Sequence, residues 1–143
     1  MQLTRAADYA VRVMIHLAKL PPGGWMRLSD LAVAADVPLS FVAKVLQRLG
    51  HAGLVASRRG MRGGFALTEV GRGATLLEVV ETIEGPLRVN LCVGESSGCL
   101  RQSSCAAHQV WLDAQRALMT VLNSASVAEL AALEVRAAAA QQS

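Results

Sequence analysis

The chain has 143 residues, with 14 Lys and Arg against 11 Asp and Glu, and a mean hydropathy of +0.36. This length suits one compact domain with a small appended element, and it excludes larger enzyme folds such as an α/β barrel of roughly 250 residues. Hydrophobic residues make up 52% of the chain and aromatic residues only 3%, so alanine supplies much of the apolar content, which favours helices. Because no apolar run reaches the about 18 residues of a membrane span and no signal peptide is recognisable, we expect a cytoplasmic protein.

Positive charge is concentrated in the first half of the chain. Residues 1–65 carry nine Lys and Arg and three Asp and Glu, a net charge of +6. Residues 66–143 carry five Lys and Arg and eight Asp and Glu, a net charge of −3. This asymmetry indicates that the first half binds a polyanion and that the second half has a different task.

In chain order, the first three expected elements are helices. Thr4 is a predicted N-cap for a helix that runs to about Leu20, where two prolines and two glycines end it. Ser29 is the predicted cap of a short second helix, and a break at Val37-Pro38 follows it. Ser40 precedes a third helix, whose apolar residues recur at helical spacing: Val42, Val45, Leu46 and Leu49.

The next segment changes character after Gly53, the predicted end of the third helix. Two short extended runs, at 55–57 and 65–67, are separated by a basic, glycine-rich turn at 58–64. This pattern predicts a β-hairpin.

The second half contains two further helical regions separated by a loop. Thr75 and Glu78 form a capping-box pattern that begins a helix ending at Gly85-Pro86. Residues 90–105 are a polar loop with all three cysteines. One long amphipathic helix follows, marked by Ala107, Val110, Trp111, Ala114, Leu118, Val121 and Leu122, and a second capping box at 126–129 begins an alanine-rich helix.

Three helices followed by a hairpin are the order of a winged helix-turn-helix, so the predicted fold is mainly α. A helix of this kind fits the major groove of double-stranded DNA, and a basic hairpin reaches the adjacent backbone or minor groove. Opposite its apolar stripe, the third helix carries Ser40, Phe41, Lys44 and Gln47, and most of these side chains can hydrogen-bond base edges or phosphates. A single exposed aromatic residue does not favour single-stranded RNA.

The hairpin tip is the strongest basic feature of the sequence. Its charge comes from three arginines: Arg58, Arg59 and Arg62. The adjacent glycines, Gly63 and Gly64, would let the backbone approach the sugar-phosphate chain. We therefore expect all five residues to contact DNA.

Cys92, Cys99 and Cys105 are separated by six and by five residues. Their Gly- and Ser-rich surroundings are poor core material, and the C-x2-4-C spacing of structural zinc sites is absent. A disulfide would leave one thiol over in a reducing compartment. Three thiolates on a loop suit an iron–sulfur cluster, with direct oxidation of the thiols as the alternative.

A cluster needs a fourth ligand, and the sequence offers two. His108 lies three residues after Cys105, on the same face of the first turn of a helix. The helix dipole at this N-terminus also favours a thiolate. Asp8 is the other candidate, and it reaches the cysteines only through the fold or from a second subunit.

With these features together, the chain resembles the Rrf-two family of transcription regulators, and within it the cluster-binding IscR, NsrR and RirA subgroups. The resemblance runs from Met1 to about Leu133. It rests on Leu3-Thr4, the run Asp8-Tyr9-Ala10-Val11-Arg12, Gly53-Leu54-Val55, Arg59-Gly60, Gly63-Gly64 and the three cysteines.

The resemblance implies a homodimer on a palindromic operator, with residues 106–122 as the dimerisation helix and with a cluster whose state changes promoter affinity. The segment from Cys105 through His108 to Trp111 is similar to the IscR subgroup, where His completes a 2Fe-2S site. The gap between Cys92 and Cys99, together with Asp8, is similar to the NsrR subgroup, where Asp from the other subunit can complete a 4Fe-4S site. Both cluster types stay open.

These observations predict three regions: a winged domain at 1–85, a cluster-binding loop at 86–105, and a dimerisation helix with a C-terminal helix at 106–143. The expected function is DNA-binding transcriptional repression that responds to iron–sulfur status, nitric oxide or redox state. The alternative is a cluster-free thiol switch. No nucleotide fingerprint or catalytic triad is present, so we expect neither an enzyme nor a small-molecule substrate.

Overall fold

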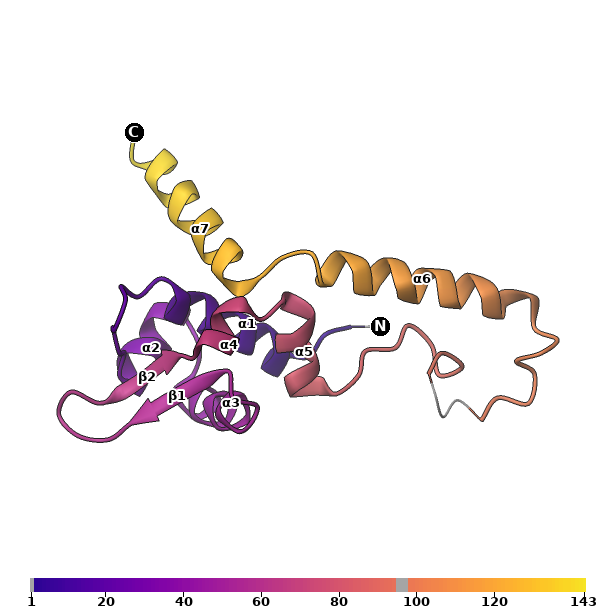
Figure 1. The fold of residues 1–143 in the computed structure, drawn as a ribbon, viewed down its shortest axis with the longest axis horizontal. Coiled ribbons are helices and arrows are strands. Elements are labelled where there is room, and N and C mark those ends of the chain that lie inside the picture. The colour runs from indigo at the N-terminus through magenta and orange to yellow at the C-terminus, as the bar shows by residue number, and fades with distance from the viewer. Residues whose placement is uncertain (1, 95–97) are drawn as a thin grey trace.

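The computed structural model describes residues 2–94 and 98–143, and within them the chain is mainly helical (Figure 1). Its elements are α1 (Arg5–Ala18), α2 (Leu28–Ala35), α3 (Leu39–His51), β1 (Val55–Arg58), β2 (Gly64–Leu67), α4 (Glu69–Gly73), α5 (Leu76–Glu84), α6 (Ala106–Leu122) and α7 (Val127–Gln141). Helix-turn-helix followed by hairpin is the predicted order, so the winged helix-turn-helix fold is confirmed.

α1 lies at the centre of the winged domain and contacts α2, α3, α5 and α7. The apolar stripe predicted for the third helix faces this core, and so does the apolar side of α1, as expected for amphipathic helices. Its main side chains are buried and apolar: Ala10, Val13, Met14, Leu17, Leu31, Val42, Val45, Leu46, Leu49, Val79 and Val80.

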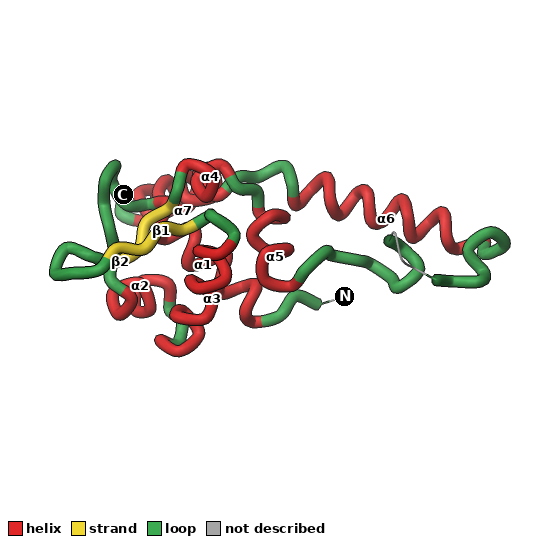
Figure 2. The backbone as a smooth tube through the Cα atoms, turned by 60° about the horizontal axis from the view of Figure 1, so that its bottom comes forward, coloured by secondary structure: helices red, strands yellow, loops and turns green. Residues whose placement is uncertain are grey.

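The hairpin pairs β1 with β2 in antiparallel register, with Val55 opposite Leu67 and Arg58 opposite Gly64. Met26 forms an isolated bridge to Phe65, so the residues before α2 lie along the outer edge of β2. Residues 58–64, the turn and the strand residue on either side of it, are called the wing loop below. Figures 1 and 2 both show this end of the hairpin projecting from the body at the end opposite α6.

Two predicted helix starts are wrong by one residue or more. α2 and α3 begin before Ser29 and Ser40, and neither serine is an N-cap. The N-caps are Arg27 and Pro38, which have extended backbones with ψ of 155° and 136° and make no side-chain cap hydrogen bond. The physical reason is local: Arg27 follows the bridged Met26, and the ring of Pro38 fixes φ near the value that a helix start requires.

The other predicted caps are present. Thr4 Oγ1 accepts a hydrogen bond from Ala7 N at 3.3 Å, and both predicted capping boxes form. In the second box, hydrogen bonds from the backbone and side chain of Ser126 lower the pKa of Glu129. These caps satisfy backbone donors that a helix start leaves without partners.

α4 is a five-residue helix that periodicity does not predict, and it packs against the start of the hairpin. Thr68 caps it by accepting from Gly71 N at 3.0 Å, and its hydroxyl donates to Gly53 O at 2.6 Å. A Cβ on Gly71 would lie 1.9 Å from Leu54 O, so only glycine fits there.

Gly71→Ala is therefore expected to reduce the free energy of unfolding by about 2–3 kcal/mol, because the backbone must shift to relieve the clash. Urea denaturation followed by circular dichroism measures the change. Gly73→Ala is the matched control, since a Cβ at Gly73 has no atom within 4 Å. Equal stability of the two variants would contradict the packing of α4 described above.

The chain leaves the winged domain after α5, runs through the cysteine-containing loop and α6, and returns with α7 (Figure 2). The two ends of this excursion are joined, because Leu76 N donates to Ala125 O at 3.0 Å and Val127 N donates to Ala74 O at 2.8 Å. α7 packs on α1 and α4, so it lies with the winged domain rather than with α6. None of the helices in the described ranges has the length and apolar content that crossing a membrane requires.

Candidate DNA interface and candidate metal centre

α3 presents the predicted polar side to solvent, because its apolar stripe is held in the core. Ser40, Lys44 and Gln47 are exposed, as expected for side chains that contact DNA. Phe41 is 40% exposed, and its ring makes an edge-on contact with Tyr9 at 5.2 Å between ring centres. The structure therefore brings the four predicted residues of this helix to one surface.

The turn between α2 and α3 is fixed by α1. Asp36 occupies the left-handed region with φ of 53°, and Arg12 Nη1 donates to its carbonyl at 3.2 Å. Arg12 also forms an ion pair with Asp8 at 2.7 Å. A guanidinium from α1 thus holds the turn that leads into α3, and the Asp8 carboxylate is engaged within its own chain.

The three arginines of the wing loop have different environments. Arg59 and Arg62 are exposed, and among the residues that the structure describes neither guanidinium has a partner. The guanidinium of Arg58 stacks 4.4 Å from the centre of the Trp25 ring and donates to Arg62 O. Arg27, which sequence reasoning missed, also reaches this loop and donates to Met61 O at 2.6 Å.

The two glycines at the end of the wing loop are required by packing within the chain. A Cβ on Gly63 would lie 2.2 Å from Arg58 O, and one on Gly64 would lie 2.4 Å from Met26 O. Gly64 also has φ of +139°, which side chains rarely permit. Close approach of Gly63 and Gly64 to DNA stays a prediction.

The three cysteines lie on an irregular segment, all as free thiols. Cys92 is half-buried, and Cys99 and Cys105 are exposed. Cys105 is the N-cap of α6, and its carbonyl accepts from His108 N at 3.1 Å, so these two residues share the first turn as predicted. Within residues 2–94 and 98–143, no three His, Cys, Asp or Glu side chains converge as a metal site.

His108 has one ring nitrogen that suits a ligand. Its Nδ1 atom is buried, and no described group lies within hydrogen-bonding distance of it. Its Nε2 atom lies 3.2 Å from Nε2 of Gln102. A buried polar atom without a partner is unfavourable, and metal binding is one way to satisfy it. Three thiols and one imidazole are donor types that an iron–sulfur cluster can take, although in residues 2–94 and 98–143 the structure does not bring three of them together.

Gln115 of α6 fixes the start of the cysteine loop. Its amide accepts from Val89 N at 2.8 Å and donates to Leu87 O at 2.7 Å, in the manner of a paired strand. Leu87 N also donates to Glu81 Oε1 at 3.0 Å, which fixes the same segment to α5. Sequence reasoning missed Gln115 because its partners lie 26 and 28 residues away.

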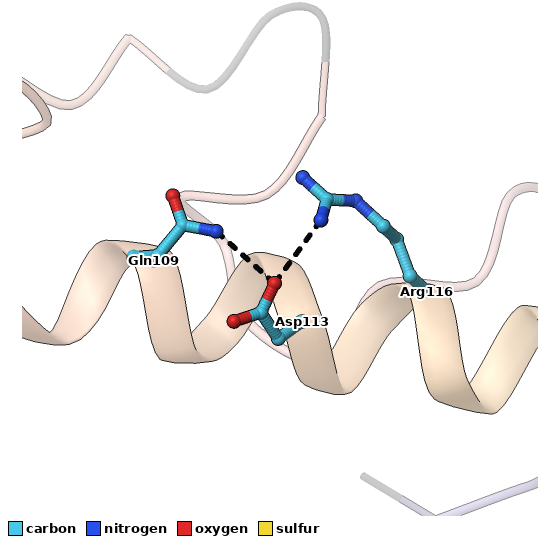
Figure 3. A network of polar contacts seen from close by, with 3 residues as sticks. All are labelled: Gln109, Asp113 and Arg116. Atoms are coloured by element: carbon cyan, nitrogen blue, oxygen red, sulfur yellow. Dashed lines mark hydrogen bonds and ion pairs between the residues drawn. The ribbon is translucent and has the colours of Figure 1, made fainter.

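The surface of α6 has two different sides. On one, Asp113 Oδ1 accepts from Gln109 at 3.0 Å and from Arg116 at 3.1 Å, as Figure 3 shows. Elsewhere the helix exposes Val110 at 64% and Val121 at 68%. In the part of the chain that the structure describes, α6 buries none of its residues. Exposed apolar residues on a projecting helix are typical of surfaces that contact other proteins.

These features define a class of protein: a winged helix-turn-helix DNA-binding protein with a cysteine-bearing loop and a projecting helix. Residues 3–133 match the Rrf2 (Rrf-two) family, described as "Iron-dependent Transcriptional regulator". The chain belongs to this family, so it is a transcriptional regulator and not an enzyme.

Individual relatives support this assignment. The chain is 33% identical to the transcriptional repressor NsrR of Streptomyces coelicolor over 92% of this chain and 89% of that protein. It is 30% identical to the regulator IscR of Yersinia pestis, over 91% of this chain and 79% of that protein. Among solved structures, CymR, the global cysteine regulator of B. subtilis, aligns with a TM-score of 0.78 at 26% identity, covering 93% of this chain and 98% of CymR.

Proposed function

We propose that this protein is a homodimeric repressor whose affinity for a palindromic operator is controlled by an iron–sulfur cluster on Cys92, Cys99, Cys105 and His108. The observation that carries the proposal is the first turn of α6, where the Cys105 thiol occurs together with the buried Nδ1 of His108, which has no hydrogen-bond partner among the described residues. When bound, the cluster would supply iron–thiolate chemistry that responds to iron–sulfur status, nitric oxide or redox state.

His108 is a better fourth ligand than Asp8. The Asp8 carboxylate is paired with Arg12, which also holds the turn of the helix-turn-helix, so ligation by Asp8 would break a contact that positions α3. His108 has no such competing contact at Nδ1 among the described residues. This favours the 2Fe-2S cluster of the IscR subgroup over a 4Fe-4S cluster with Asp8 from the partner subunit.

The DNA contacts are proposed at α3 and the wing loop. Ser40, Lys44 and Gln47 would contact the major groove, with Phe41 beside them. Arg59 and Arg62 would neutralise phosphates. A two-fold dimer presents two such surfaces, which explains the expected palindromic operator.

Arg59→Ala is expected to weaken operator binding about five- to tenfold and to reduce the slope of log K against log salt by about 0.9 for each phosphate that is no longer neutralised. Fluorescence anisotropy at several salt concentrations measures both, with an operator selected in vitro by the wild-type protein. Arg72→Ala is a control, because Arg72 is exposed on α4, outside the wing. If Arg59→Ala and Arg72→Ala bound alike, the wing would not be a DNA contact.

The contacts of the chain itself connect the cysteine loop to the recognition helix. Gln115 holds the loop at Leu87 and Val89, and α5 precedes this segment directly. At the end of α5, Arg48 of α3 donates to Ile83 O at 2.6 Å. A change in the loop would therefore move groups that hold α3, and in a dimer it would alter the spacing of the two recognition helices.

A cluster-free thiol switch is the second candidate. The observation that favours it is the exposure of Cys99 and Cys105, since accessible thiols are oxidised most readily. CymR of B. subtilis, whose structure is similar to that of this chain, is named the global cysteine regulator.

Anaerobic purification with absorbance spectroscopy and iron analysis distinguishes the two. The cluster proposal expects about two to four irons per chain and an operator affinity that changes at least about tenfold on their removal. An iron-free protein that binds DNA normally and responds to peroxide would support the thiol switch instead.

A further inference from the structure

The residues just before α2 lie against the hairpin from its outer edge. Met26 N donates to Phe65 O at 3.0 Å, and Phe65 N donates to Met26 O at 2.8 Å. Because side chains alternate along extended backbone, Trp25 and Arg27 project to the same side of this segment. Gly64 permits the approach, since a side chain there would clash with Met26 O.

The guanidinium of Arg58 makes two kinds of contact within the chain, a stacking contact with its face and hydrogen bonds with its edge. The face of its guanidinium lies over the Trp25 ring at 4.4 Å, which is a cation–π contact. Its edge donates to Arg62 O from Nε at 3.2 Å and from Nη2 at 2.5 Å. A guanidinium held on its face and along its Nε–Nη2 edge is fixed in orientation, with three of its five N–H donors unused by these two contacts.

Arg27 fixes the neighbouring carbonyl of the same loop. Its Nη2 atom donates to Met61 O at 2.6 Å, so two consecutive carbonyls, of Met61 and Arg62, are each held by a guanidinium. Met61 itself is 90% exposed at the tip of the loop. Arg59 and Arg62 are also exposed there. The loop thus has a fixed backbone and an outward-facing set of side chains.

We propose that Trp25, Arg27 and Arg58 form a brace that holds the wing loop in the conformation that DNA binds. Arg58 is then a positioning residue, and Arg59 and Arg62 are the wing residues that touch phosphates. Fixing the loop before binding removes the entropy loss of ordering it on the operator. The brace rests on the wing being a DNA contact, as proposed above.

The test measures operator affinity and its salt dependence for the full-length protein. Trp25→Leu removes no charge, yet it is expected to weaken binding about three- to tenfold, and Trp25→Phe is expected to restore most of the affinity. Arg58→Leu should weaken binding similarly and keep the wild-type salt slope, whereas Arg59→Ala lowers that slope. The double variant of Trp25→Leu and Arg58→Leu should bind no more weakly than Arg58→Leu alone, because Arg58→Leu already removes the contact with the Trp25 ring.

A spectroscopic measurement separates the brace from general loss of structure. In a Trp111→Phe background, Trp25 is the only tryptophan, and Arg58→Leu is expected to increase its quenching by acrylamide, whereas Arg59→Ala is not. Arg27→Gln changes an exposed side chain and provides a second variant if Trp25→Leu unfolds.

Different outcomes would contradict the brace and the DNA contact of the wing loop. Wild-type binding by Trp25→Leu and Arg27→Gln, or a salt slope of Arg58→Leu equal to that of Arg59→Ala, would overturn the brace alone. Unchanged binding by Arg59→Ala would remove the wing from the DNA interface, and the brace would fail with it.

Discussion

Replacing Val110 by lysine is expected to convert the protein from a dimer to a monomer and to weaken operator binding by about 100-fold or more. Val110 is an exposed apolar residue on α6, the proposed dimerisation helix, and a lysine charge there would have to be buried against the partner. A monomer binds one half-site at a time, so it loses the gain of about 10²–10⁴ that joining two binding modules provides.

Gln109→Lys is the matched control for this variant. It places the same charge one residue earlier, beside the Asp113 carboxylate of the polar side, where a lysine is favourable (Figure 3). Sedimentation equilibrium gives the dimer dissociation constant, and anisotropy gives operator affinity. A Val110→Lys protein that remains dimeric at micromolar concentration would show that α6 is not the subunit interface.

Local pattern predicted most of the fold. The apolar stripes of α1 and α3 and the capping boxes of α5 and α7 are encoded within about one to four turns of helix, so periodicity and capping rules find them. Two features were missed for physical reasons. α4 is too short for a period to show. The start of α2 depends on the bridge between Met26 and Phe65, which joins residues 39 positions apart.

Some residues of the candidate site could also be predicted from local sequence, and others could not. Residue type and spacing predicted the outward face of α3 and the shared first turn of Cys105 and His108. They could not predict that Arg58 stacks on Trp25, or that Gln115 pairs with the backbone of the cysteine loop, because both contacts depend on tertiary packing. Residues that could bind DNA or metal can be predicted from their type and spacing, whereas the residues that position them are identified only from the folded structure.

Cys105→Ala is expected to abolish stable cluster binding, with loss of most of the iron and of the visible absorbance after anaerobic purification. The thiol stands at the N-terminus of α6, and it is one of only three in the chain. Because alanine offers no electron pair, at most two thiolates and His108 remain, which is too few for either cluster type. Operator affinity should then equal that of the cluster-free wild-type protein under all conditions.

Ser104→Ala is the matched control, since it alters the adjacent exposed residue of the same loop without removing a metal donor. His108→Ala and Asp8→Ala then identify the fourth ligand: the first is expected to change the absorbance spectrum and shorten the lifetime of the cluster in air, and the second to leave both unchanged. The reverse result would assign the site to Asp8, which would have to leave Arg12 to reach it. Wild-type iron content in Cys105→Ala would contradict the cluster site altogether, and the exposed thiols would then be the sensor.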